Sequence, residues 1–183
     1  MQLKQCTPAN YTLAIDPGTH ATGVALFRKC EMMDSFTLKA TKKVKNSDLR
    51  AFHLIQELDE IVLPTLRCRG CGVIHSALVY ENPQMFRIKG GLKVMEPVVR
   101  MAGMLSYWGM LHGFSVFSYP VTTIKAGIAG RNSASKEQVE TIMHKVLDLD
   151  GHNRPDHEYD AMSVAVYHLD QVRPGCFGVT LPM

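Results

Sequence analysis

The 183-residue chain has no apolar run of the roughly 18 to 20 residues that a helix needs to span a bilayer. It also lacks the charged-then-apolar N-terminal pattern of a signal peptide, and it contains no repeats, low-complexity tracts or obvious linker. Because 46% of its residues are hydrophobic, one domain over residues 1–183 with a sizeable core accounts for the length. We therefore expect a soluble, intracellular, cytoplasmic protein that contacts no membrane.

Cysteines are few and odd in number, five in all, which argues against a disulfide framework and predicts reduced thiols. Cys68 and Cys71 have the spacing of half a zinc site, but no second close pair of Cys or His residues follows at a convincing distance. Free thiols are therefore expected there, and a zinc site shared between subunits is the alternative.

The net charge is also low, at +3, but positive residues gather in one short segment. Residues 39–45 contain four lysines. Such a run is most often a solvated loop, and its functional interpretation is an edge that contacts phosphate.

Turn signals and the spacing of apolar residues predict a mixed α/β domain. Ser135 followed by Gln138 forms a capping box at the start of one helix. In the first helix, which Ser47 and Asp48 open, apolar residues recur at helical spacing: Leu49, Phe52, Ile55, Leu58 and Val62. The expected strands cover about 11–16, 22–29, 31–39, 76–81 and 114–119, and the expected helices about 47–64, 96–112, 135–148 and 155–171.

Three acidic residues lie at the ends of apolar strands or on the last predicted helix. Carboxylates are rarely buried in such places without a function. Asp16 ends an apolar strand just before a Pro-Gly turn, Glu81 ends another strand, and Asp160 lies on the last helix. Asp16 has three interpretations: a ligand of a divalent metal, part of a turn that cradles a nucleotide phosphate as in actin-like ATPases, or an Asx-type turn opener. Glu81 is alternatively an edge carboxylate paired with a lysine, and Asp160 a charge near a helix N-terminus.

The order of elements favours one fold class. Three strands, a helix, a strand, a helix, a strand and two helices are the arrangement of the ribonuclease H-like fold. Its mixed sheet combines an antiparallel meander with parallel strands and is flanked by helices. Carboxylates at the ends of neighbouring strands, joined by one from a helix, then converge on a pocket that can hold two magnesium ions.

Local motifs carry a resemblance to a family. Ile15-Asp16-Pro17-Gly18, followed by Thr22-Gly23, resembles the opening motif of the RuvC Holliday-junction resolvases. The segment 123–139, with its glycine-rich turn through Gly130, is similar to the family's basic segment and following helix. Residues 157–165 resemble its terminal catalytic helix. The resemblance covers about residues 11–171.

The resemblance implies a metal-dependent, structure-selective endonuclease that resolves four-way DNA junctions, and other branched DNA, by paired phosphodiester hydrolysis. The implied catalytic and metal-binding residues are Asp16, Glu81, His157 and Asp160. His157 matches a position that is Asp in some members, and it either ligates a metal ion or positions the attacking water. Asp156 is the alternative to His157, because hard divalent ions prefer oxygen ligands. The implied cofactor is Mg²⁺, replaceable by Mn²⁺, with two ions in each site.

The resemblance also implies a set of DNA contacts. Lys125 and Lys136 match basic residues that the family places beside the scissile phosphate. Arg87, Lys89 and Lys93 follow the Glu81 strand and are expected near the same mouth. Phe86 is the candidate for an aromatic wedge, although its spacing from Glu81 departs from the family pattern, and a core role is the alternative.

The expected helix 96–112 carries small residues that allow close approach of another helix: Ala102, Gly103, Ser106 and Gly109. Packing on its own sheet explains such a face, while the resemblance implies a two-fold homodimer through this helix. A helicase partner cannot be assigned. The alternative functions are a nuclease for flap DNA or RNA, a junction-binding protein without cleavage, and an actin-like ATPase, for which the chain is too short.

Overall fold

The computed structural model describes residues 11–68, 72–73, 76–83 and 92–177. Its main sheet has five strands in the order β3-β2-β1-β6-β7, and the predicted ribonuclease H-like fold is confirmed. β1, β2 and β3 form an antiparallel meander, whereas β1–β6 and β6–β7 are parallel pairs. The strands are β1 (Tyr11–Asp16), β2 (Ala21–Arg28), β3 (Glu31–Lys39), β6 (Ala77–Asn82) and β7 (Ser115–Pro120).

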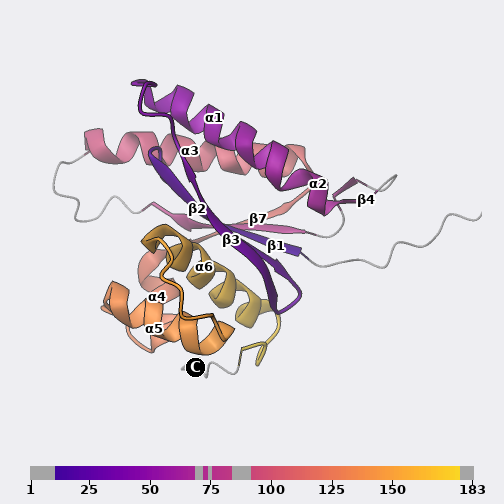
Figure 1. Ribbon diagram of the computed structural model, residues 1–183, viewed down its shortest axis with the longest axis vertical. Helices are drawn as coiled ribbons and strands as arrows, with labels where there is room; N and C mark the ends of the chain where they lie inside the picture. Colours follow the sequence, from indigo (N-terminus) through magenta and orange to yellow (C-terminus); the bar gives the residue numbers. More distant parts are fainter. Residues whose placement is uncertain (1–10, 69–71, 74–75, 84–91, 178–183) are drawn as a thin grey trace, which may run out of the picture.

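Helices cover both faces of this sheet (Figure 1). On one face lie α1 (Ser47–Ile61) and α3 (Leu92–Leu111), and on the other lie α4 (Val121–Ala129), α5 (Lys136–Leu147) and α6 (Asp156–Val172). The central strand β1 is therefore apolar on both sides, as parallel sheets require. Leu13 and Ile15 enter the core under α1 and α3, while Ala14 enters the core under α6, and all three are fully buried.

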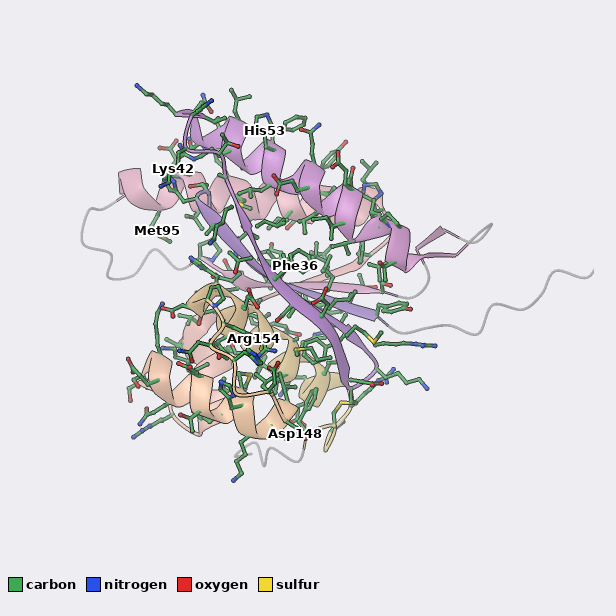
Figure 2. The ribbon with its side chains drawn as sticks, in the orientation of Figure 1. Phe36, Lys42, His53, Met95, Asp148 and Arg154 are labelled. Atoms are coloured by element: carbon green, nitrogen blue, oxygen red, sulfur yellow. A yellow bond between two sulfur atoms is a disulfide. The ribbon has the colours of Figure 1, made fainter. Side chains whose placement is uncertain are left out.

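Side chains fill the space between the layers (Figure 2). Phe36 of β3 packs against the core beneath α1, and Lys42 lies in the loop between β3 and α1. The Arg50 side chain fastens this lysine-bearing loop by donating to the carbonyl groups of Val44, Lys45 and Thr19. The loop is thereby tied to the turn that follows Asp16.

Most helix ends fall within a few residues of the predicted ones. The capping box of Ser135 and Gln138 is present. Asn46, not Ser47, caps α1, because its side chain accepts from two backbone N–H groups of the first turn. α1 ends at Ile61, and a short helix α2 (Leu63–Leu66) follows with Pro64 in its first turn, where a missing N–H is tolerated. α3 starts at Leu92, before the predicted start, and runs through Pro97.

Four of the described elements were not predicted: the short helix α2, the helix α4, and the two strands of a second sheet, β4 (Arg67–Cys68) and β5 (Gly72–Val73). α4 has nine residues and is rich in β-branched side chains, so its intrinsic helix preference is weak. It is held by burial of Ile124 and Ile128, which lie one turn apart on its inner side.

The predicted apolar face of α1 is partly wrong. Leu49 and Phe52 are about half exposed, at 52% and 48%. The buried face is rotated from the predicted one and consists of Ala51, Leu54, Ile55 and Leu58, with Val62 just beyond the helix. An apolar strip of α1 is therefore left on the surface.

The prediction that all thiols are reduced is also wrong, because Cys30 and Cys176 form a disulfide. It joins the turn after β2 to the segment after α6, and its partners are 146 residues apart in the sequence. Cys71 lies outside the described residues, so the zinc alternative for Cys68 and Cys71 stays a prediction. No helix in the described part of the chain is long and apolar enough to cross a membrane.

Candidate active site

Asp16 is positioned by the central strand. It is the last residue of β1, and its side chain is 16% exposed. Its Oδ2 atom lies 2.6 Å from Nδ1 of His157 in the first turn of α6. This hydrogen bond raises the pKa of His157, and burial of the ring opposes the shift. Residues 141 positions apart are thus joined at one end of the sheet.

Glu81 lies on β6, between β1 and β7, so the alternative of an edge-strand carboxylate does not hold. β6 runs parallel to β1, so Glu81 and Asp16 lie at the same end of the two neighbouring strands. Burial raises the pKa of Glu81 to about 7, and the charges of Asp16 and Asp160 add to the rise. Burial likewise raises the pKa of Asp160 to about 6, followed by the charge of Asp16.

The first turn of α6 approaches the sheet closely at Gly23. A Cβ atom at this position would overlap the backbone carbonyl of His157, so only glycine fits. Gly23 is the cross-strand partner of Asp16. The glycine of the Thr22-Gly23 motif therefore lets α6 bring His157 within hydrogen-bonding distance of Asp16.

Asp156 is an exposed residue that pairs with a lysine. Its side chain is 69% exposed, and Oδ2 accepts a hydrogen bond from Nζ of Lys136 at 3.0 Å. The bond raises the pKa of Lys136 and lowers that of Asp156. Of the two residues that compete for the position beside Asp160, His157 is the one directed toward Asp16.

Two lysines lie within electrostatic reach of the acidic cluster, since the charges of Lys125 and Lys136 both oppose the rise in the Glu81 pKa. Nζ of Lys125 donates to the backbone carbonyl of Ala134 at 2.7 Å, which ties α4 to the turn before α5. Phe86, Arg87 and Lys89 lie outside the described residues.

The donor set suits a divalent metal. Burial and the charge of Asp16 disfavour the ionised forms of Glu81 and Asp160, and a cation bound beside them would offset that penalty. Among the described residues, no three His, Cys, Asp or Glu side chains are arranged to hold an ion as they stand, and Asp16 is turned to His157. The side chains that could hold the ion are therefore those of Asp16, Glu81 and Asp160, with His157 beside Asp16.

Glu158 was missed by the sequence reasoning. It is only 7% exposed, and its carboxylate accepts hydrogen bonds from the hydroxyl groups of Ser35 and Thr37 on β3. The sequence holds no local signal for these contacts, because the partners are more than 120 residues away.

A mixed sheet with carboxylates at the ends of two central strands, and a third on the helix packed across them, defines the class of ribonuclease H-like nucleases. The model of the family "Crossover junction endodeoxyribonuclease RuvC" matches residues 12–168. The chain belongs to this RuvC family.

Relatives and solved structures agree with this assignment. The RuvC of Cupriavidus pinatubonensis is 30% identical over 164 residues, which cover 86% of this chain and 82% of the relative. The RuvC of Syntrophomonas wolfei is 25% identical over 169 residues, which cover 90% of this chain and 91% of the relative. The Thermus thermophilus RuvC in complex with a Holliday junction substrate has a TM-score of 0.71 at 22% identity, covering 91% of this chain and 96% of that one. At this identity the likeness to the solved structure establishes the fold.

The raised carboxyl pKa values predict how stability depends on pH. A carboxyl group whose pKa is higher in the folded state binds its proton more tightly there, so the metal-free protein loses stability as pH rises from about 4.5 to about 7. Glu81→Gln removes this penalty. We expect it to increase the free energy of unfolding at pH 8 by roughly 1 to 2 kcal/mol, with little change at pH 4.5.

Chemical unfolding in the presence of a chelator measures both values. Glu60→Gln, at an exposed position on α1, is the matched control and should change neither. Equal stabilities of wild type and Glu81→Gln at pH 8 would show that Glu81 ionises without an appreciable penalty.

Proposed function

We propose that this chain resolves four-way DNA junctions by metal-dependent hydrolysis, with Asp16, Glu81 and Asp160 as the metal ligands. The single observation that carries the proposal is the electrostatic coupling of these three carboxylates at one end of the sheet of a RuvC family member. Mg²⁺ is the proposed metal, replaceable by Mn²⁺, with two ions in each site.

Phosphodiester hydrolysis needs a deprotonated water, stabilisation of charge on the phosphoryl group and help for the leaving oxygen. Bound divalent ions supply these functions. The protein holds the carboxylates on two paired strands and one helix, so their separation is fixed by backbone packing. His157 is proposed as the fourth member of the site, since its hydrogen bond to Asp16 places it beside the ligands.

Basic residues next to the site would contact the phosphate backbone of the DNA. Lys136 is 62% exposed in its side chain and close enough to Asp160 to feel its charge. Lys125 is held in place by the Ala134 carbonyl. We propose that both neutralise phosphates near the cut, as positive groups beside an acidic site do. The proposed DNA contacts of Phe86, Arg87 and Lys89 stay predictions.

A surface on the other face of the sheet suits a second copy of the chain. The groove between α1 and α3 has a volume of about 770 Å³, and Phe52, Tyr107 and Leu111 line it with large apolar surfaces. These three side chains are 48%, 67% and 67% exposed. We propose that it is the homodimer interface, because a continuous exposed apolar groove needs a partner and a dimer presents two sites to two DNA strands.

The two glycines of α3 have different surroundings. A Cβ at Gly103 meets no atom within 4 Å, and this residue lines the groove. A Cβ at Gly109 would lie 2.5 Å from Cδ2 of Leu78 and 3.0 Å from Cγ2 of Val116, on the protein's own sheet. Gly109 therefore fits the alternative of packing on the protein's own sheet, and only Gly103 is proposed for the interface.

Substitution of the proposed metal ligands is expected to abolish most of the cleavage activity. Asp16→Asn, Glu81→Gln and Asp160→Asn should each reduce cleavage of a labelled four-way junction in Mg²⁺ by at least about 100-fold, because removal of a ligand charge weakens transition-state stabilisation. Junction affinity should change only a few-fold. Linear and flap DNA serve as substrate controls, and wild-type rates for any one variant would remove that residue from the site.

His157 and Asp156 are separated by their alanine variants. His157→Ala should lose most of the cleavage rate, and His157→Asp should retain more of it, since a carboxylate can also ligate the ion. Asp156→Ala should be mild, because its partner is the exposed Lys136. The opposite order of the two alanine variants, at equal folded fraction, would assign the position to Asp156.

The dimer interface is tested on Gly103. Gly103→Arg should give monomers by analytical ultracentrifugation, with a melting temperature within a few degrees of wild type, because the new side chain enters open space. Gly103→Ala is the matched control and should remain dimeric. Gly109→Arg should instead unfold the protein. A wild type that sediments as a monomer with junction DNA at micromolar concentration would contradict the interface.

A further inference from the structure

Glu158 is a buried carboxylate beside the site, yet it does not face the other carboxylates. Its Oε2 atom accepts from Oγ of Ser35 at 2.9 Å, and its Oε1 atom accepts from Oγ1 of Thr37 at 3.2 Å. A buried charge without partners is strongly unfavourable, so the two hydroxyl groups of β3 are what make its burial possible. Asp156, two residues earlier, is exposed on the same helix. The burial of Glu158 is thus specific to its side of α6.

The contacts of the first turn of α6 follow a single line across the sheet. Asp16 on β1 pairs with Gly23 on β2, and Gly23 pairs with Thr37 on β3. On this row, His157 bonds to Asp16, the His157 carbonyl rests on Gly23, and Glu158 bonds to Thr37. Three neighbouring strands therefore each hold one point of the same helical turn.

Two of these contacts constrain different motions of the turn. The glycine contact sets how closely the helix approaches the sheet. The Glu158 bonds to β3, on the side away from β6, oppose rotation of α6 about its axis and sliding along the row. Asp160 is two residues further on, so any such motion changes its distance from Asp16 and Glu81. A displacement of about 1 Å at a catalytic site can cost about 100-fold in rate.

We propose that Glu158 is a positioning residue: bound to Ser35 and Thr37, it fixes the first turn of α6 so that Asp160 and His157 meet Asp16 and Glu81 in metal-binding geometry. The proposal rests on the proposed function of the site. Glu158 is not proposed as a metal ligand, because both of its oxygens are directed to hydroxyl groups of β3.

The test compares Glu158→Ala with Glu158→Gln in the full chain, and it measures junction cleavage against Mg²⁺ concentration. Glu158→Ala should lower the rate at saturating Mg²⁺ by about 10- to 100-fold or raise the half-saturating Mg²⁺ concentration by at least about 5-fold. Glu158→Gln keeps a hydrogen-bonding partner for both hydroxyls and should stay within about 3-fold of wild type.

Asp170→Ala is the matched control. Asp170 is also a buried carboxylate of α6, 5% exposed, but it lies at the far end of the helix and accepts from the backbone N–H of Gly175. A structural loss alone would lower the active fraction without changing the Mg²⁺ half-saturation. The proposal is overturned if Glu158→Ala behaves as Asp170→Ala does, once rates are normalised to the folded fraction.

Two further measurements cover the remaining outcomes. If Glu158→Ala does not fold, Ser35→Ala and Thr37→Val carry the test, and wild-type rates and half-saturation for both would overturn the proposal. Titration of Mn²⁺ by calorimetry separates it from the proposed function. Suppose the wild type binds Mn²⁺ without cleaving junctions. An affinity of Glu158→Ala for Mn²⁺ that is about 10-fold weaker than that of the wild type then supports the positioning role, and an equal affinity overturns it. A wild type that neither cleaves nor binds Mn²⁺ overturns both.

Discussion

The parallel pairing of β1 with β6 is the constraint on which the rest of the structure depends. Parallel strands end at the same edge of a sheet, so this pairing alone places Asp16 beside Glu81. It also requires a crossover, which α1 supplies, and it buries β1 on both faces. The antiparallel meander on the other side then provides Gly23 and Thr37 as a support for the helix that carries the third carboxylate.

Bringing the carboxylates together has an energetic consequence. Burial and mutual repulsion raise the pKa values of Glu81 and Asp160, which means that their charged forms are disfavoured in the folded protein without a cation. The surrounding contacts resist this repulsion: the His157 bond to Asp16, the β3 bonds to Glu158 and the dense packing of α6. The same residues that make the metal-free site unfavourable are those that would bind a metal strongly, so stability and activity oppose each other here.

Features that depend on local sequence were predicted more accurately than features that depend on contacts between distant segments. Strands, long helices and the capping box are local and were predicted closely, and the motifs around Asp16 and Asp160 identified the fold and the family. α4 was missed because its helical state depends on burial of Ile124 and Ile128 by tertiary contacts. The Cys30–Cys176 disulfide and the Glu158 bonds join segments more than 120 residues apart, and no local pattern marks them. Two of the five apolar residues predicted to face the core from α1, Leu49 and Phe52, are exposed, since an apolar spacing does not say which side faces its own core.

The exposed apolar residues of α1 show that the two faces of the sheet have different surroundings. On the α6 face, polar side chains are buried against the strands and hold charged groups in fixed positions. On the α1 and α3 face, apolar side chains remain at the surface around Gly103, away from any of the charged groups of the site. Because β1 contributes Leu13 and Ile15 to one core and Ala14 to the other, one strand joins the two layers. A second copy bound at the α1 and α3 groove would therefore contact a layer that β1 joins to the layer carrying the acidic residues.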